Sequence, residues 1–209
     1  MTVKYDADTY NCKYGRVMKY DIQTILKRYE SGESLEFLFF WGHHGKPDRV
    51  TKACLSQWFP AFFEVDGDKY NCAEQYMMAE KARVFHDPET WEKIMKSSSP
   101  REIKALGREV RNFDAEQWLT VSKDIVVKGN LYKFAQNKDM LDFLKNTGDK
   151  ILVEASPCDT IWGIGMSERD EGVEDPYNWK GSNLLGLALM EVRDEFRYRY
   201  NECIWTKNL

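Results

Sequence analysis

A series of helix-start signals follows residue 70, and it restricts this chain to a largely helical fold. Each signal is an N-capping side chain ahead of a segment with helical apolar period, and in two cases proline comes next. The signals are Asp87-Pro88, Ser99-Pro100, Asp114 and Asn137. The predicted helix that begins at Asn137 stops at Asn146-Thr147-Gly148. Together with a helix over residues 71–86, this pattern predicts a mainly α fold and not the alternating strands and helices of a doubly wound sheet.

A few short strands complete the predicted fold. The run at 35–41 predicts a buried strand, and 61–65 with 69–70 predicts a hairpin that turns at Asp66-Gly67-Asp68. Further predicted elements are a short helix at 21–29, a strand at 151–155 and an amphipathic helix from 183 to about 199. With 209 residues, we expect one globular domain. We expect an irregular N-terminal arm that ends with the short helix (1–35), the domain itself (36–199) and a C-terminal tail (200–209).

Composition excludes several function classes. A net charge of −4 gives no general attraction to nucleic acid or an anionic membrane, so a nucleic-acid role needs a local basic site. The five cysteines are far apart and form no C-x-x-C pair, which argues against disulfides and zinc and favours an intracellular, cytoplasmic protein. His43-His44 lacks a third ligand at suitable spacing, so we predict neither metal nor cofactor. No apolar run reaches membrane-spanning length.

The predicted helix at 71–86 combines a core face with a reactive face. Glu74, Met78 and Lys81 recur at helical spacing and put a carboxylate and an amine on one side. The core residues would be Ala73, Met77, Ala82 and Phe85. On spacing alone, the simpler interpretation is that Asn71 and Glu74 form a capping box and that Lys81 is a solvated surface lysine.

Three other stretches combine glycine with polar or aromatic side chains. In Gly107-Arg108, a glycine inside a helical pattern implies a close approach, and Arg108, with Arg111 nearby, could bind phosphate or simply be solvated. In the stretch from Asp159 to Gly165, Asp159 could orient a water or cap a turn, and Trp162 could stack on a base. The first N–H groups of the helix that begins near 181–186 could meet a phosphate, or that stretch is simply an N-cap.

Taken in order, these motifs resemble the NADAR, or YbiA-like, family, whose name refers to NAD and ADP-ribose chemistry. The resemblance covers roughly residues 36–197, and such an ordered series is far more specific than any single motif. The matching residues are Ser56, Glu74-Gln75-Tyr76, Lys81, Gly107-Arg108, Trp118, Asp159, Trp162-Gly163, Gly165, Gly181, Asn183, Leu185-Gly186, Leu189-Met190 and Arg193.

The resemblance implies a mainly α, YbiA-like fold and N-glycosidase activity on a ribose C1′–N bond. Two substrate classes are associated with the family: ADP-ribose on guanine in DNA or RNA, which we expect here, and phosphoribosylamino-pyrimidine intermediates of riboflavin biosynthesis. The resemblance supports Lys81 as a nucleophile that forms a Schiff base, with Glu74 as the general acid if burial raises its pKa. The alternative pairs Glu74 with Asp159 as two carboxylates.

The remaining predicted site residues would bind substrate. Arg108 would take a phosphate, while Trp58, Trp118 and Trp162 would stack on base or adenine. The others are Ser56, Gly163, Gly165 and Asn183. The chain departs from the family at Gln57-Trp58, where asparagine and an aromatic commonly follow the serine, and in the loop at 43–52, which is longer than usual. A non-catalytic NAD or ADP-ribose sensor and a structural helical module are the other hypotheses. The oligomeric state is open.

Overall fold

The computed structural model describes residues 20–46 and 48–205, and it describes side chains as far as Arg197. The predicted irregular arm therefore lies outside the described residues except at its end. The chain divides into two compact units, residues 40–146 and residues 1–39 with 147–209. Each unit is described by itself, and the expectation of one globular domain remains a prediction.

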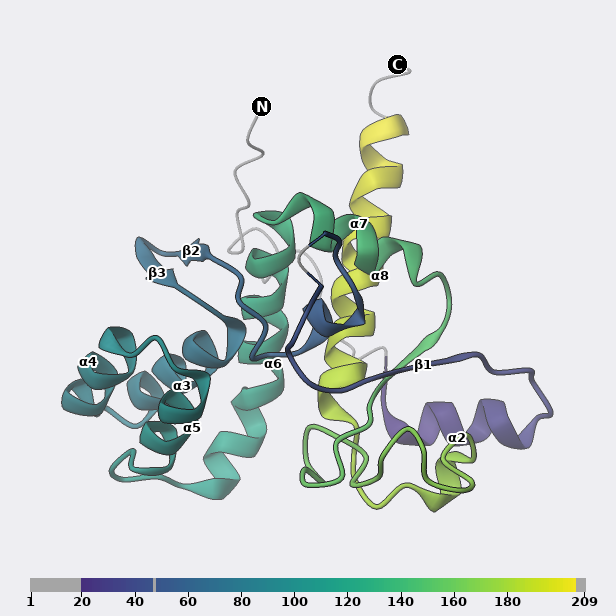
Figure 1. The fold of residues 1–209 in the computed structure, drawn as a ribbon, viewed down its shortest axis with the longest axis horizontal. Helices are drawn as coiled ribbons and strands as arrows, with labels where there is room; N and C mark the ends of the chain where they lie inside the picture. The colour runs from purple at the N-terminus through teal and green to yellow at the C-terminus, as the bar shows by residue number, and fades with distance from the viewer. Residues whose placement is uncertain (1–19, 47, 206–209) are drawn as a thin grey trace. The chain divides into compact units, whose positions relative to one another are not determined.

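The unit of residues 40–146 is built around helix α3. Its elements in chain order are η1 (Lys52–Leu55), β2 (Phe63–Val65), β3 (Asp68–Tyr70), α3 (Ala73–Val84), α4 (Pro88–Lys96), α5 (Pro100–Arg108), α6 (Ala115–Ala135) and α7 (Lys138–Asn146). Helices α4, α5 and α6 all pack against α3, as Figure 1 shows. The short strands β2 and β3 form the predicted antiparallel hairpin. The mainly α fold with few short strands is thus confirmed.

Three of the four predicted helix starts are confirmed at atomic level; α7 does begin after Asn137, but that side chain donates to the Phe62 and Lys133 carbonyls and does not cap the helix. Asp87, Ser99 and Asp114 each accept a hydrogen bond from the backbone N–H three residues later, over 3.2, 3.4 and 2.9 Å. These bonds satisfy N–H groups that have no partner within the helix. In α4 and α5, proline occupies the start of the helix, where its missing N–H costs nothing.

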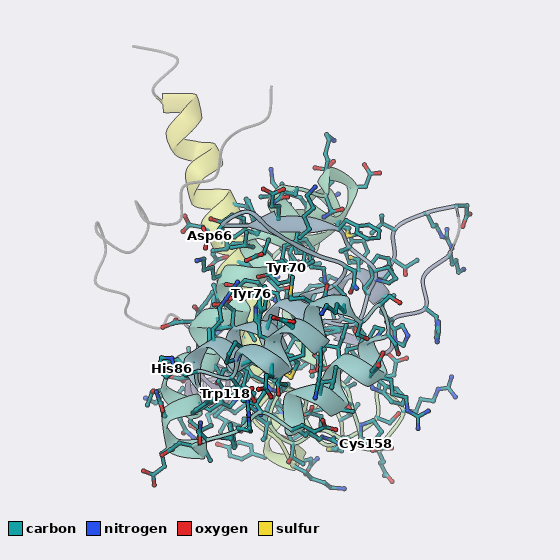
Figure 2. All side chains as sticks on the ribbon, turned by 90° about the vertical axis from the view of Figure 1, so that its left-hand side faces the viewer. Asp66, Tyr70, Tyr76, His86, Trp118 and Cys158 are labelled. Carbon is teal, nitrogen blue, oxygen red and sulfur yellow. The ribbon has the colours of Figure 1, made fainter. Side chains whose placement is uncertain are left out.

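The core face of α3 is also as predicted. Ala73, Met77, Ala82 and Phe85 are all buried. Tyr76 packs edge-on against Tyr70 with ring centroids 5.1 Å apart, and both rings are marked in Figure 2. On α6, a Cβ added at Gly129 would lie 2.4 Å from Cδ1 of the Tyr76 ring, so glycine lets the two helices approach.

The predicted capping box of α3 is wrong. The N-cap is Cys72, which makes no side-chain capping bond, and Asn71 lies one residue outside the helix. Gln75, and not Glu74, reaches back and accepts a hydrogen bond from the Asn71 backbone N–H over 2.8 Å. With the helix starting one residue later than expected, the returning position falls on Gln75.

The unit of residues 1–39 and 147–209 contains fewer helices and strands than the other unit. It contains α2 (Ile22–Glu30), strands β1 (Phe37–Phe40) and β4 (Ile151–Glu154), η2 (Pro176–Asn178) and α8 (Leu184–Trp205), with Phe40 belonging to the other unit. Strands β1 and β4 pair. The strand predicted as buried is only partly so: of the residues of β1, only Phe40 is buried, and Trp41 just after the strand is 57% exposed.

Helix α8 packs closely against β4. All residues from Leu185 to Met190 are buried, so the predicted amphipathic character is wrong for this half of the helix. Asn183 fixes the start of the contact, because its Oδ1 accepts from the Glu154 N–H and its Nδ2 donates to the Leu152 carbonyl, each over 2.9 Å. A Cβ at Gly186 would lie 2.0 Å from that same carbonyl oxygen. Glycine therefore permits the contact between helix and strand.

Candidate functional site

The predicted site residues fall into two groups, one in each unit. The unit of residues 40–146 holds Ser56, Trp58, Glu74, Lys81, Arg108 and Trp118. The other unit holds Asp159, Trp162, Gly163, Gly165 and Asn183. Lys81, Arg108 and Trp118 lie together in the first group, with Glu74 on the same helix as Lys81.

The Lys81 amine lies in a half-buried aromatic cage. Its Nζ donates a 2.7 Å hydrogen bond to the Gly107 carbonyl, near the end of α5 where helix carbonyls lack intrahelical partners. The same nitrogen is 3.9 Å from the Phe113 ring centroid and 5.9 Å from that of Trp118, which Figure 2 marks. Burial, and secondarily the nearby Arg108 cation, lowers the pKa of Lys81. At a given pH, a larger fraction of Lys81 is therefore in the neutral, nucleophilic form than for a lysine in water.

Gly107 explains how α5 comes near enough to hold this amine. A Cβ at that position would lie 2.0 Å from Sδ of Met78, so the thioether occupies the space that a side chain would need. Met78 stands between Glu74 and Lys81 on the reactive face of α3. The close approach that was predicted for this helical glycine is therefore confirmed, and Met78 is its cause.

Glu74 lies in the first turn of α3 and is 6% exposed. Its backbone N–H donates to the Gln57 carbonyl over 2.9 Å, which ties the start of α3 to the segment after η1. The positive end of the helix macrodipole favours a carboxylate at this position. Glu74 and Lys81 are seven residues apart, about 10 Å along the helix axis, with the buried Met78 side chain between them on the same face.

A buried polar network that the sequence reasoning missed holds Ser56 and Gln57. Lys133 is fully buried and donates to the Ser56 carbonyl over 2.9 Å. One turn earlier on α6, the Asn130 amide donates to Gln57 Oε1 over 2.9 Å. Burial lowers the pKa of Lys133 to about 8. The sequence did carry a signal for this network. Asn130 and Lys133 stand three residues apart on one face of a largely apolar part of α6, where buried polar groups require partners.

Arg111, predicted near Arg108 at a possible phosphate site, is engaged with Asp87, and a joint phosphate contact remains a prediction. Arg111 forms an ion pair with Asp87 over 2.7 Å, and its backbone N–H donates to the other oxygen of the same carboxylate over 2.9 Å. These bonds, the side-chain bond first, lower the pKa of Asp87. Arg111 thus links α4 to the segment after α5, whereas Arg108 is exposed at the end of α5.

Three further side chains of this unit, Phe113, Lys104 and His43, flank predicted site residues. Phe113 is 45% exposed and lies edge-on against Phe85, with centroids 5.2 Å apart. Lys104 Nζ lies 5.8 Å from the Trp58 ring centroid, and the His43 ring is 5.5 Å from the same indole. Phe113 was missed by sequence reasoning, although it stands at N′ of α6, five residues before Trp118 at N4, which is the spacing of a hydrophobic staple.

In the other unit, the predicted residues form a tightly hydrogen-bonded loop. Asp159 Oδ1 accepts from the N–H groups of Ile161 and Trp162, over 3.0 and 2.8 Å, which is the turn-capping alternative. A Cβ at Gly163 would lie 2.9 Å from the carbonyl oxygens of Asp159 and Glu154. Gly165 has a φ of +65° and needs the left-handed region. Substrate contacts of Asp159, Trp162 and Asn183 remain predictions.

The expectation that the start of α8 offers N–H groups to a phosphate is wrong. The N–H groups of Asn183, Leu184 and Leu185 donate to loop carbonyls, those of Gly163, Ile161 and Trp162 respectively. Because these donors already have backbone partners, the usual basis of an anion site at a helix N-terminus is missing here. Gly181 permits this packing, since a Cβ there would lie 2.4 Å from the Gly163 carbonyl oxygen.

Within the part of the chain that the structure describes, His, Cys, Asp and Glu side chains form no group of three or more that could hold a metal ion. Among the helices of that part, none is both long and apolar enough to cross a bilayer.

Comparison with known proteins identifies similar sequences and a similar fold. The NADAR domain family model matches residues 39–197. N-glycosidase R617 of Acanthamoeba polyphaga mimivirus is 44% identical over 78% of this chain and 98% of its own length. N-glycosidase Npun_R5314 of Nostoc punctiforme is 32% identical over 69% of this chain and 85% of its own. The solved structure of the Escherichia coli protein YbiA superposes with a TM-score of 0.65 at 25% identity, covering 80% of this chain and 88% of that one.

Proposed function

Since this chain belongs to the NADAR family, we propose that it is an N-glycosidase that removes ADP-ribose from ADP-ribosylated guanine bases in nucleic acid. Relatives named N-glycosidase support the reaction class, a hydrolase that cleaves a ribose C1′–N bond. The finer substrate assignment is our proposal. The observation that supports the proposed reaction is the Lys81 amine, which is half-buried beside aromatic rings and has a lowered pKa.

In the proposed reaction, the neutral Lys81 amine attacks C1′. The C1′–N bond to the base breaks, and Glu74 delivers the proton that the departing base requires. The sugar ring then opens to a Schiff base between Lys81 and C1′. Water adds to the carbon of that C=N bond, releases the sugar as its aldehyde and returns the free amine. Partial burial and the nearby Arg108 cation favour the neutral amine, against the cation–π attraction of the Phe113 and Trp118 rings for the ammonium form.

The lysine route is preferred over a pair of carboxylates for a structural reason. Asp159 Oδ1 already accepts two backbone N–H groups, an arrangement that fixes a loop. A lysine nucleophile is favoured by partial burial and a lowered pKa, and Lys81 has both. Arg108, exposed beside Gly107, is the proposed phosphate contact, because its guanidinium can bind a phosphate through two hydrogen bonds.

The test compares substrates. The protein is incubated with an oligonucleotide carrying ADP-ribosylated guanine and, separately, with the phosphoribosylamino-pyrimidines of riboflavin biosynthesis. We expect release of ADP-ribose from the first. Cleavage of the pyrimidines alone would replace our substrate with the alternative one. Tight binding of ADP-ribose without any cleavage would instead support a non-catalytic sensor.

The pH dependence should change when Arg108 is replaced by glutamine. Activity is expected to rise with pH as Lys81 loses its proton. Arg108 disfavours the ammonium form, so its removal raises the pKa of Lys81 and moves the rising limb of kcat to higher pH. The control is Arg169→Gln, an exposed arginine of the other unit, whose profile should match the wild type. A limb that stays in place or moves to lower pH in Arg108→Gln would argue against Lys81 as the titrating nucleophile.

A further inference from the structure

Helix α5 has a basic face that is separate from the face it buries. Arg101, Lys104 and Arg108 recur at spacings of three and four and therefore share one side of the helix. Both arginines are exposed and Lys104 is half-buried, whereas Ile103 and Gly107 are buried on the other side. Like charges at this spacing repel one another, so an anionic partner on this face is favoured.

The one acidic residue within α5, Glu102, points elsewhere, and Glu109 follows the helix as its exposed C-cap. Glu102 lies on the opposite side of the helix wheel from Lys104, and its Oε2 accepts a 2.6 Å hydrogen bond from the Ser97 hydroxyl before the helix begins. The three cations are thus concentrated on one face of a protein whose net charge is −4. A local basic surface of this kind is what a chain without general attraction to nucleic acid would need.

An aromatic platform adjoins this basic face. The Trp58 indole is half-buried, with the Lys104 ammonium 5.8 Å from its centroid and the His43 ring 5.5 Å away. A flat indole beside cations offers stacking to a base and charge to the neighbouring phosphates. An acidic peptide would satisfy the cations but would leave the stacking surface without a flat partner.

The basic face is also linked to the proposed site by covalent structure. Gly107, whose carbonyl holds the Lys81 amine, immediately precedes Arg108. From Arg101 to Arg108 the helix rises about 10 Å, so the three cations follow a line that ends next to the amine. A strand whose modified base is held at Lys81 can therefore run back along α5.

We propose that Arg101, Lys104 and Arg108, together with Trp58, bind the single-stranded polynucleotide that flanks the modified base. This inference rests on the proposed function. In this proposal the cations of α5 bind the phosphate backbone and Trp58 stacks on a flanking base. His43, in the loop at 43–52, would help to hold that indole.

The experiment uses the double variant Arg101→Ala/Lys104→Ala, which leaves Arg108, Trp58 and Lys81 intact. On a single-stranded DNA oligonucleotide with one ADP-ribosylated guanine, we expect KM to rise about tenfold and the slope of log affinity against log salt to fall by about 2. On ADP-ribosylated guanosine, which has no flanking phosphates, kcat and KM should equal those of the wild type.

The matched control is Lys69→Ala/Lys138→Ala, which removes two exposed cations from β3 and α7 and should behave as wild type on both substrates. Equal losses on oligonucleotide and nucleoside, or no loss on either, would overturn the inference.

Fluorescence anisotropy with unmodified single-stranded DNA provides a readout without turnover. Should the wild type cleave neither substrate, the proposed function fails, but weaker DNA binding by the α5 variant than by the control still supports this surface. Equal binding of an acidic peptide with the same number of charges would refute it.

Discussion

Lys81→Ala is expected to lower kcat for release of ADP-ribose by about 10³-fold or more, because it removes the nucleophile and not merely a binding contact. The free energy of unfolding should change little by comparison, since Lys81 is half-buried and its one described hydrogen bond ends at the Gly107 carbonyl. Substrate release followed over time, with circular dichroism to verify folding, measures both quantities.

Borohydride trapping identifies the covalent step. Hydride reduces the C=N bond between C1′ and the Lys81 nitrogen to a stable secondary amine, so the wild type should retain the sugar. Lys81→Ala should not. Lys81→Arg keeps a cation but offers no neutral amine, so it should be equally inactive and untrapped. The matched control is Lys96→Ala on α4, an exposed lysine paired with Glu92, which should be trapped like the wild type.

A second lysine makes the trapping result informative. Lys133 also has a lowered pKa, about 8, but it is fully buried and donates to the Ser56 carbonyl. Mass spectrometry of the trapped protein should therefore place the adduct on Lys81. An adduct that persists in Lys81→Ala would exclude Lys81 as the nucleophile, whichever residue then carried it.

The helix starts could be predicted because their signals are local. An aspartate or serine before proline satisfies backbone N–H groups within one turn, whatever the rest of the chain does, as at Asp87 and Ser99. The start of α3 was misplaced for the opposite reason. Its first turn is satisfied by the distant Gln57 carbonyl and by Gln75, so the local pattern of Asn71 and Glu74 misled.

The candidate site was only partly predictable for a similar reason. Periodicity put Glu74 and Lys81 on one face, and the family resemblance gave them roles. Neither periodicity nor the resemblance could reveal that the Gly107 carbonyl holds the amine. That contact depends on Met78, which fills the space that Gly107 leaves between α3 and α5. Phe113 could have been predicted from its position before the cap of α6. The aromatic cage as a whole could not, since it combines three segments.

The largest loss of stability is expected for Gly186→Ala on α8. The added Cβ would lie 2.0 Å from the Leu152 carbonyl oxygen and 2.6 Å from both Asn183 amide atoms. Neither neighbour can move freely, because the carbonyl belongs to β4 and Asn183 bonds that strand at two points. Overpacking against backbone should cost about 3 kcal/mol, well above the roughly 1 kcal/mol that alanine gains over glycine in a helix.

Gly107→Ala is the matched control for this steric argument. Its Cβ would also lie 2.0 Å from a heavy atom, but that atom is the sulfur of Met78, the far part of a flexible side chain. Urea unfolding should therefore give a clearly smaller loss for Gly107→Ala than for Gly186→Ala. Equal losses would mean that closeness alone, and not the rigidity of the neighbour, sets the effect. A Gly186→Ala protein as stable as the wild type would show that α8 can move away from β4, against the role assigned here to the Asn183 bonds.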